Sequence, residues 1–234
     1  MSNAYQSGEL SDPRKTSEQS KESVAKTQQL PRTLPDLTAK EEQTASDKET
    51  ARANDAALEN EADFQAGQEE VLKMIGANAP LGEILTKLVL LMEAQSPEML
   101  CSVLLLSDDG DHIRHGAAPS LPEEYVKAVD GAPIGPKNGS CGTAMWRGKP
   151  VIVTDIFTDP LWEDYRDLAS VSGLGACWST PILTATGKVL GSFAMYYREP
   201  RAPTGAEARL TDVATRLAGQ AIEQRNAQRW TGKG

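Results

Sequence analysis

The stretch at 139–197 constrains the fold more than any other part of this 234-residue chain. It contains two of the three cysteines and three of the four tryptophans. Residues 151–154 are expected to form a strand. Residues 176–183 and 188–197 are expected to form a β-hairpin, because turn residues separate the two apolar runs. Strands that alternate with turns and short helices indicate a mixed α and β domain.

The segments before this stretch predict one helix and two strands. Between Leu81 and Met92, apolar residues recur at spacings of three and four, which indicates a core-facing helix. The run LCSVLLL at 100–106 is short and continuously apolar, as is typical of a strand covered on both faces. A Ser-Asp-Asp-Gly turn follows, and 112–116 is the expected returning strand. Residues 123–129 predict a short helix.

Helix signals also occur in the second half of the chain. The Gly-Ser-Cys-Gly turn that starts at Gly139 is expected to lead into a short helix at 143–147. Asp159 is expected to cap the start of the helical turn at 160–162, in which Pro160 takes the first position. Thr204 and Glu207 have the spacing of a capping box, which predicts the start of a last helix that ends near Arg229.

The first 66 residues have a different character. They hold thirteen Asp or Glu and eight Lys or Arg but few large apolar residues. Such a segment buries too little apolar surface to offset the entropy of ordering it, so residues up to Pro35 are expected to be disordered. Residues 36–79 favour helix by propensity, yet their first half lacks an apolar stripe, so a solvated helix and a partly helical tail both fit. The expected division is an N-terminal segment at 1–66, a folded domain at 67–229 and a tail at 230–234.

Composition excludes several classes of function. The net charge of −9 argues against nucleic acid or an anionic membrane surface as the main partner, since both demand clustered Lys and Arg. There is no run of about 18 apolar residues and no secretory signal, so a cytoplasmic location is expected. Three widely spaced cysteines do not resemble a disulfide scaffold or a zinc site. His112 and His115 would point to opposite faces of a strand, so no metal site is predicted.

Five strings together resemble the GAF domain family, in particular the GAF domains found beside PAS, histidine kinase and diguanylate cyclase modules in bacterial sensors. They are CSVLLL, GSCGTAMWRGKPVIVTDI, DPLWEDYRDLA, ACWSTPI and LGSFAMYYREPRAPT, and the resemblance covers roughly 69–225. It implies an α+β fold with an antiparallel sheet of five or six strands. The terminal helices would lie on one face, and a ligand cavity roofed by loops and small helices on the other.

The resemblance implies a sensory or regulatory module that binds a small molecule or an anion. The Asn-Lys…Asp-Glu pattern of cyclic-nucleotide GAF domains is absent, and Cys177 is followed by tryptophan instead of the histidine of bilin-binding domains. No output domain follows the last expected helix, so a signal would pass through the N-terminal segment or to a kinase or cyclase in trans. Apolar surface on the helices at 81–92 and 210–221 favours a homodimer through a four-helix bundle.

Two groups of residues are the candidate ligand site. The hydroxyls of Ser140 and Thr143 and the amides near Cys141 are suited to holding an anion at a helix start, with plain helix capping as the alternative. A cysteine at this position should favour its thiolate, or it simply fills a tight turn. The other expected cavity residues are three aromatic residues and two polar ones, each with core packing or capping as its alternative: Trp162, Tyr165, Trp178, Asp155 and Ser192.

Two further functions remain open. Free methionine-R-sulfoxide reductases, which also have the GAF fold, carry a cysteine at the place that matches Cys141. Those enzymes need a second and usually a third cysteine in the loop before the turn and in the segment after the next strand, and this chain has none there. A reductase is therefore the second hypothesis, and a ligand-free interaction module is the third. No catalytic residue is assigned, and the sequence does not identify a cofactor.

Overall fold

The computed structural model describes residues 34–231 of the chain, which separates into two compact units at 1–56 and 57–234. The prediction of disorder up to Pro35 falls almost entirely outside the described residues, and so does most of the tail at 230–234. Helix α1 (Leu34–Gly76) is continuous over 43 residues. A solvated helix and a partly helical tail were the two alternatives for 36–79, and the structure contains a helix there.

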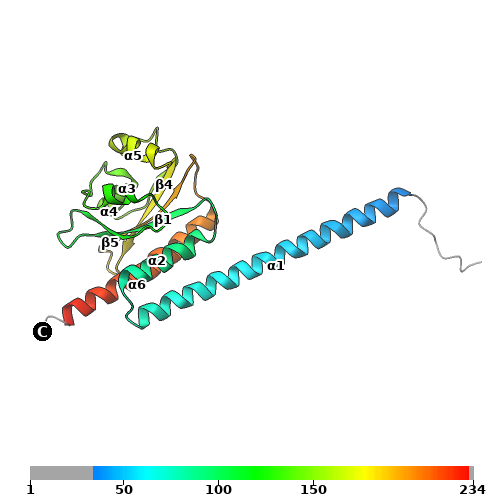
Figure 1. Cartoon of the computed structure of the whole chain (residues 1–234), viewed down its shortest axis with the longest axis horizontal. Helices are drawn as coiled ribbons and strands as arrows, with labels where there is room; N and C mark the ends of the chain where they lie inside the picture. The colour runs from blue at the N-terminus through cyan, green and yellow to red at the C-terminus, as the bar shows by residue number, and fades with distance from the viewer. Residues whose placement is uncertain (1–33, 232–234) are drawn as a thin grey trace, which may run out of the picture. The chain divides into compact units, whose positions relative to one another are not determined.

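A five-stranded antiparallel sheet forms the centre of the second unit, with the strand order β2-β1-β5-β4-β3 (Figure 1). The expected strands and the α+β fold are confirmed, with every strand end within one residue of the prediction. The strands are β1 (Leu100–Leu106), β2 (Ile113–Ala117), β3 (Val151–Val153), β4 (Ala176–Leu183) and β5 (Val189–Tyr197).

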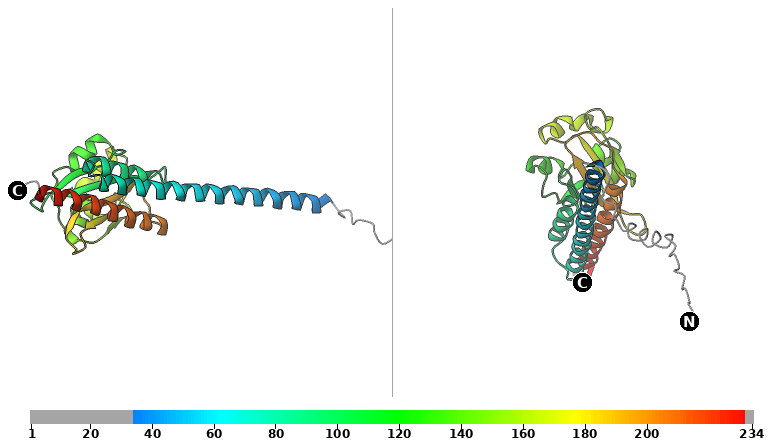
Figure 2. Two further views of the ribbon diagram at one scale, coloured as in Figure 1. Left: turned by 90° about the horizontal axis from the view of Figure 1, so that it is seen from below. Right: turned by 90° about the vertical axis from the view of Figure 1, so that its right-hand side faces the viewer.

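The terminal helices cover one face of the sheet, as expected (Figures 1 and 2). Helices α2 (Leu81–Glu93) and α6 (Gly205–Thr231) pack on it, and buried residues from the C-terminal part of α1 belong to the same core. Leu88 from α2 and Leu217 from α6 are fully buried there, in one core with Phe193 of β5. The Gln224 side chain of α6 donates a 2.5 Å hydrogen bond to the Ile75 carbonyl, which ties α6 to the end of α1.

The small helices cover the opposite face of the sheet (Figure 1). They are α3 (Glu123–Val129), α4 (Gly139–Arg147), the 3₁₀ helix η1 (Pro160–Tyr165) and α5 (Arg166–Val171). Successive side chains of β5 alternate between the two cores: Met195 and Tyr197 point to the terminal helices, whereas Tyr196 points to the small helices. The sheet therefore separates two buried cores.

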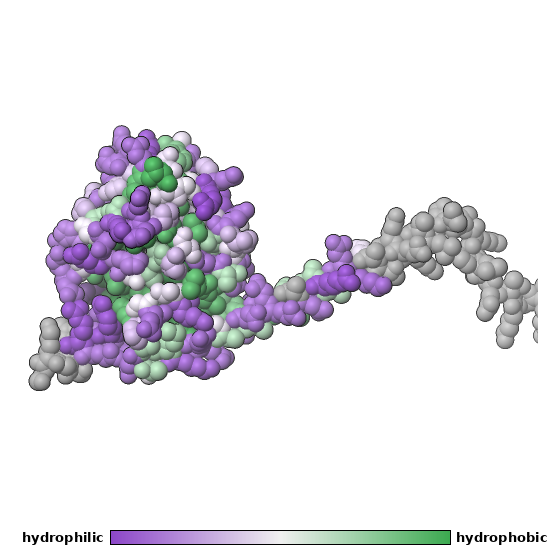
Figure 3. Space-filling model, in the orientation of Figure 1, coloured by the Kyte–Doolittle hydropathy of each residue, from purple (hydrophilic) through white to green (hydrophobic). Residues whose placement is uncertain are grey.

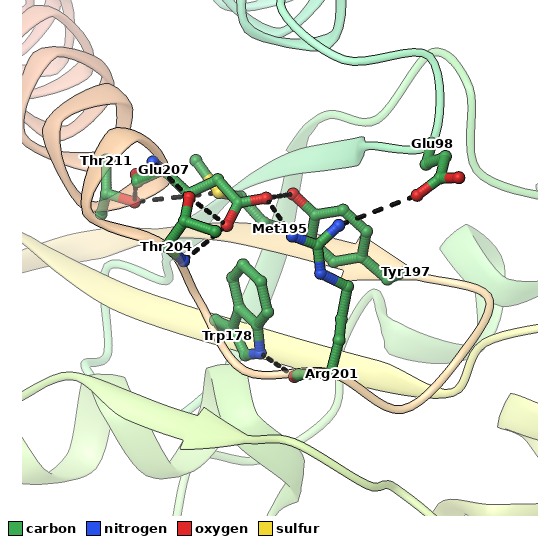
Figure 4. Close-up of polar contacts among 8 residues, drawn as sticks. All are labelled: Glu98, Trp178, Met195, Tyr197, Arg201, Thr204, Glu207 and Thr211. Carbon is green, nitrogen blue, oxygen red and sulfur yellow. Dashed lines mark hydrogen bonds and ion pairs between the residues drawn. The ribbon is translucent and has the colours of Figure 1, made fainter.

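The start of α6 is held by a cluster of polar and aromatic groups, which we call the α6 joint: Trp178, Tyr197, Arg201, Thr204 and Glu207 (Figure 4). The predicted capping box is present, since the Thr204 amide donates to Glu207 Oε2 at 2.7 Å and the Glu207 amide donates to Thr204 Oγ1 at 3.3 Å. Tyr197 Oη and Arg201 Nη2 donate to Glu207 Oε1 at 2.6 and 2.9 Å. The Arg201 guanidinium lies 4.3 Å from the centre of the Tyr197 ring. The joint thus connects the end of β5 directly to α6.

The face of the molecule drawn in Figure 3 carries many polar side chains. Figure 3 shows hydrophilic side chains along the described part of α1 and over most of the visible face of the domain, with hydrophobic residues in separate small patches. Within residues 34–231, no helix has both the length and the apolar character needed to cross a membrane.

Candidate ligand-binding site

Helix α4 begins at Gly139, earlier than the predicted start at Thr143. Gly139 has a φ of +60°, a left-handed conformation that glycine adopts at little cost. At Gly142, a Cβ would stand 2.9 Å from Asn138 Cβ and 3.3 Å from the Pro133 carbonyl oxygen, so the preceding loop packs directly against the helix. The segment expected to be a turn is therefore the first turn of α4.

A cavity of about 40 Å³ lies beside this first turn. A water molecule needs roughly 10–15 Å³ of such space, so the cavity has room for a ligand of only a few heavy atoms unless its walls move. Among the described residues that line it, none carries a formal charge. The lining residues are Ile113, Tyr125, Ala128, Val129, Ala132, Pro133, Asn138, Gly139, Ser140, Cys141, Gly142, Trp162, Tyr165 and Leu168.

Ser140 connects three elements around the cavity. The Trp162 indole Nε1 of η1 donates to Ser140 Oγ at 2.9 Å, and Ser140 Oγ donates to the Cys177 carbonyl of β4 at 3.0 Å. All three groups are buried. Because each buried polar group here has a partner, the bridge fixes both the first turn of α4 and the indole that forms one wall.

A second network lies between α4 and the sheet. Tyr196 Oη is 3.1 Å from Ser102 Oγ and 3.4 Å from Cys141 Sγ, and the Tyr125 ring packs on Tyr196 edge to face at 5.7 Å. The hydroxyls of Ser179 and Ser192 are also buried on this side of the sheet.

This network favours negative charge on one sulfur. The neighbouring Cys177 side chain lowers the pKa of Cys141; burial opposes this, and the Tyr196 hydroxyl adds to the lowering. Burial raises the pKa of Cys177, and the neighbouring Cys141 thiol adds to that increase. Burial also raises the pKa of Tyr196. Cys141 is therefore the group in this network that loses its proton first.

The structure brings four of the predicted site residues to the cavity and places two others in capping roles. Ser140, Cys141, Trp162 and Tyr165 are the four that line it. Thr143 is fully buried, and its Oγ1 accepts the Asn138 amide at 3.1 Å, which is the capping alternative.

Asp155 also adopts its alternative role. Its carboxylate accepts the Phe157 amide at 3.0 Å and the Thr158 hydroxyl at 2.9 Å, so it stabilises the turn that follows β3. It is not among the residues that line the cavity.

Trp178 and Ser192 lie away from the cavity, in contrast to the expectation. Trp178 points to the terminal helices, where its ring centre is 4.7 Å from that of Tyr197 and its Nε1 donates to the Arg201 carbonyl at 3.2 Å. Ser192 is on the cavity side of the sheet, but its hydroxyl is buried and outside the cavity lining. Strand β4 is largely buried on both faces, so its sequence did not reveal which residues point to which side.

Tyr125, Tyr196 and Asn138 were not recognised from the sequence as site residues. Tyr125 and Asn138 line the cavity, and Tyr196 organises the network behind it. One signal was available: two adjacent tyrosines in a strand must point to opposite faces, so one of Tyr196 and Tyr197 had to face the cavity side. Within residues 34–231, no group of three or more His, Cys, Asp or Glu is arranged to hold a metal ion.

Comparison with known proteins agrees with this architecture. The family model for the GAF domain matches residues 78–223. The methyl sulfide methyltransferase-associated sensor of Methanosarcina acetivorans is 42% identical over 156 residues, a match that covers 67% of this chain and 16% of that sensor. The chain thus spans less than a fifth of the length of this curated relative.

Solved structures share the fold at low sequence identity. A domain of a two-component sensor histidine kinase protein from Sinorhizobium meliloti 1021 has a TM-score of 0.54 at 21% identity, covering 66% of this chain and 99% of that one. The free methionine-R-sulfoxide reductase from Neisseria meningitidis has a TM-score of 0.53 at 14% identity, covering 70% and 91%. With a family model that spans more than half of its length, the chain belongs to the GAF domain family.

Proposed function

We propose that this GAF domain is a sensory module that binds a small molecule or a small anion in the cavity beside α4. The observation that carries the proposal is the position of that cavity, which lies between aromatic rings and the first turn of α4 on the face opposite the terminal helices. Uncharged walls and helix amides suit a small neutral ligand or a compact anion such as nitrate or formate.

The terminal helices are the proposed output. A ligand that moves α4 acts on the sheet through Ser140 and Tyr196, and the α6 joint holds α6 to the same sheet. The relative from Methanosarcina acetivorans is named a sensor, and a similarly folded domain belongs to a sensor histidine kinase protein. We infer that the domain acts in the cytoplasm as a homodimer through α2 and α6, with a kinase or cyclase as the partner that receives the signal.

Native mass spectrometry of the purified chain tests ligand binding directly, because a retained small mass reveals the ligand. Calorimetric titration with nitrate, formate, acetate and bicarbonate follows if the protein is isolated empty. We expect Trp162→Leu to abolish binding, since Trp162 forms a wall of the cavity. The matched control is Trp146→Leu, at a tryptophan that is 55% exposed and outside the cavity lining, which should bind as the wild type does. Equal binding by both variants, or no binding by any form of the protein, would remove the basis of the proposal.

A reductase acting on free methionine sulfoxide is the second candidate, because Cys141 lines the cavity and Cys177 lies beside it. The cavity of about 40 Å³ is too small for a substrate of ten heavy atoms without movement of its walls, which favours the sensor. Reduction of the sulfoxide to methionine in the presence of dithiothreitol, if lost in Cys141→Ser, would favour the reductase over the sensor. A ligand-free interaction module, the third candidate, predicts a dimer that retains no small mass.

A further inference from the structure

Two of the three cysteines meet in the network behind the cavity, and ligand binding requires the chemistry of neither. The bond from Ser140 Oγ to the Cys177 carbonyl fixes the first turn of α4 on β4, and Cys141 is the next residue of that turn. Tyr196, the residue opposite Cys177 in the pairing of β4 with β5, lies 3.4 Å from Cys141 Sγ through its hydroxyl. Both cysteines belong to the same buried core beneath the small helices.

The two thiols differ in access and in acidity. Cys141 lines the cavity and keeps 6% of its surface exposed, whereas Cys177 is completely buried behind it. The hydrogen bonds that lower the pKa of Cys141 favour its thiolate, the reactive form of cysteine. A small oxidant in the cavity therefore meets the more reactive sulfur first, with a second thiol placed behind it.

We propose that Cys141 and Cys177 form an oxidisable pair, which hydrogen peroxide entering the cavity beside α4 closes into an intramolecular disulfide. In the first step, the Cys141 sulfur attacks one peroxide oxygen and the O–O bond breaks. The products are a sulfenic acid on Cys141 and hydroxide, which takes up the thiol proton to become water. In the second step, the Cys177 sulfur attacks the sulfenic sulfur, so that an S–S bond forms, the S–O bond breaks and the hydroxyl leaves as water with the Cys177 proton. Overall, two thiols lose two electrons and one peroxide becomes two waters.

The size of the cavity selects the oxidant. About 40 Å³ accommodates the two oxygen atoms of hydrogen peroxide but not a bulky aromatic hydroperoxide. Cumene hydroperoxide at the same concentration should therefore react at least about tenfold more slowly, since it must wait for the walls to open.

Cys101 provides an internal control. It is completely buried in the core on the other face of the sheet, and burial raises its pKa, with the nearby Glu93 carboxylate adding to the increase. The sheet separates it from Cys141 and Cys177, which both belong to the core beneath the small helices. Cys101 should therefore neither react with peroxide nor form a disulfide with either of the other cysteines.

The test uses the full chain, reduced, freed of reductant and treated with hydrogen peroxide under native conditions. We expect the intact mass to fall by about 2 Da, the mass of two hydrogens, and peptide mapping to link residue 141 to residue 177. Cys101→Ser should lose the same mass. Cys177→Ser should stop at the sulfenic acid, which dimedone traps on Cys141. Cys141→Ser and Cys141→Ala should remain unchanged, with circular dichroism showing that each is folded.

Three results would overturn the proposal. They are an unchanged mass in the wild type, a loss of about 2 Da that persists in Cys177→Ser, and a disulfide that includes Cys101 or joins two chains. None of these measurements depends on the ligand, so the oxidisable pair can fail while the ligand-binding proposal stands, and the reverse is also possible.

Discussion

The substitution Tyr197→Phe tests the α6 joint with the loss of a single atom. It removes the hydroxyl that donates a 2.6 Å hydrogen bond to Glu207 Oε1 and leaves the aromatic ring beneath the Arg201 guanidinium. A hydrogen bond to a charged group contributes about 1.5–3 kcal/mol. Glu207 keeps its bonds from Arg201 and Thr204, so the joint loses one contact of several. We expect the free energy of unfolding to fall by about 1.5–3 kcal/mol, which lowers Tm by roughly 3–12 °C for a domain of this size.

The loss should depend on pH in a defined direction. Partial burial alone would raise the pKa of Glu207, but the hydrogen bonds from Tyr197 and Thr204 and the charge of Arg201 outweigh it, so the folded pKa is lowered. Such a carboxylate stabilises the fold fully above its unfolded pKa of about 4.3, and the contribution is lost as the pH falls through the lower folded pKa. The penalty of Tyr197→Phe should therefore be complete near neutral pH and shrink as Glu207 becomes protonated.

Urea unfolding monitored by tryptophan fluorescence at about pH 7 and at about pH 3 measures both effects. Other titrating groups cancel when the variant is compared with the wild type at each pH. The matched control is Tyr165→Phe, which removes a hydroxyl that accepts a longer bond of 3.3 Å from Nδ2 of the Asn138 side chain at a part-buried site. It should cost less than about 1 kcal/mol. A cost for Tyr197→Phe that equals the control, or that is independent of pH, would refute the role given to the joint.

Close packing and the bridge at Ser140 give further predictions. A Cβ at Gly191 would lie 2.1 Å from the Leu104 carbonyl oxygen, so Gly191→Ala should cost at least about 2 kcal/mol in urea unfolding. Gly219→Ala in α6 meets nothing closer than 3.5 Å and should stabilise the protein by about 0.5–1 kcal/mol. Ser140→Ala breaks the bridge to the Trp162 indole and should cost about 1–3 kcal/mol, and Trp162 fluorescence, isolated as the difference from Trp162→Leu, should change with it.

The sequence was most informative where a pattern has only one physical solution. The run at 100–106 and the hairpin at 176–197 are apolar segments bounded by turn residues, and their strands appear within one residue of the prediction. The capping box formed by Thr204 and Glu207 depends on a fixed spacing of three residues, so the sequence predicted it as well. The wider contacts of Glu207 were not, because Tyr197 and Arg201 reach it through the fold and not through local spacing.

The site was harder to predict because its position depends on orientation. In β4 every residue from Ala176 to Ser179 is buried, so alternation could not show that Cys177 faces the cavity side and Trp178 the terminal helices. Likewise, the glycines around Cys141 suggested a turn, whereas a single left-handed residue, Gly139, starts a helix there. Periodicity identifies which residues are buried, but tertiary packing decides which core each one joins.

The adjacent tyrosines of β5 give the domain a very short path between its two faces. Tyr196 touches Cys141 beneath the cavity, and Tyr197 touches Glu207 at the root of α6. A single peptide unit separates the two side chains, so a shift of the strand end by a fraction of an ångström changes both contacts together. One peptide unit of β5 thus links a contact beneath the cavity to a contact at the start of α6.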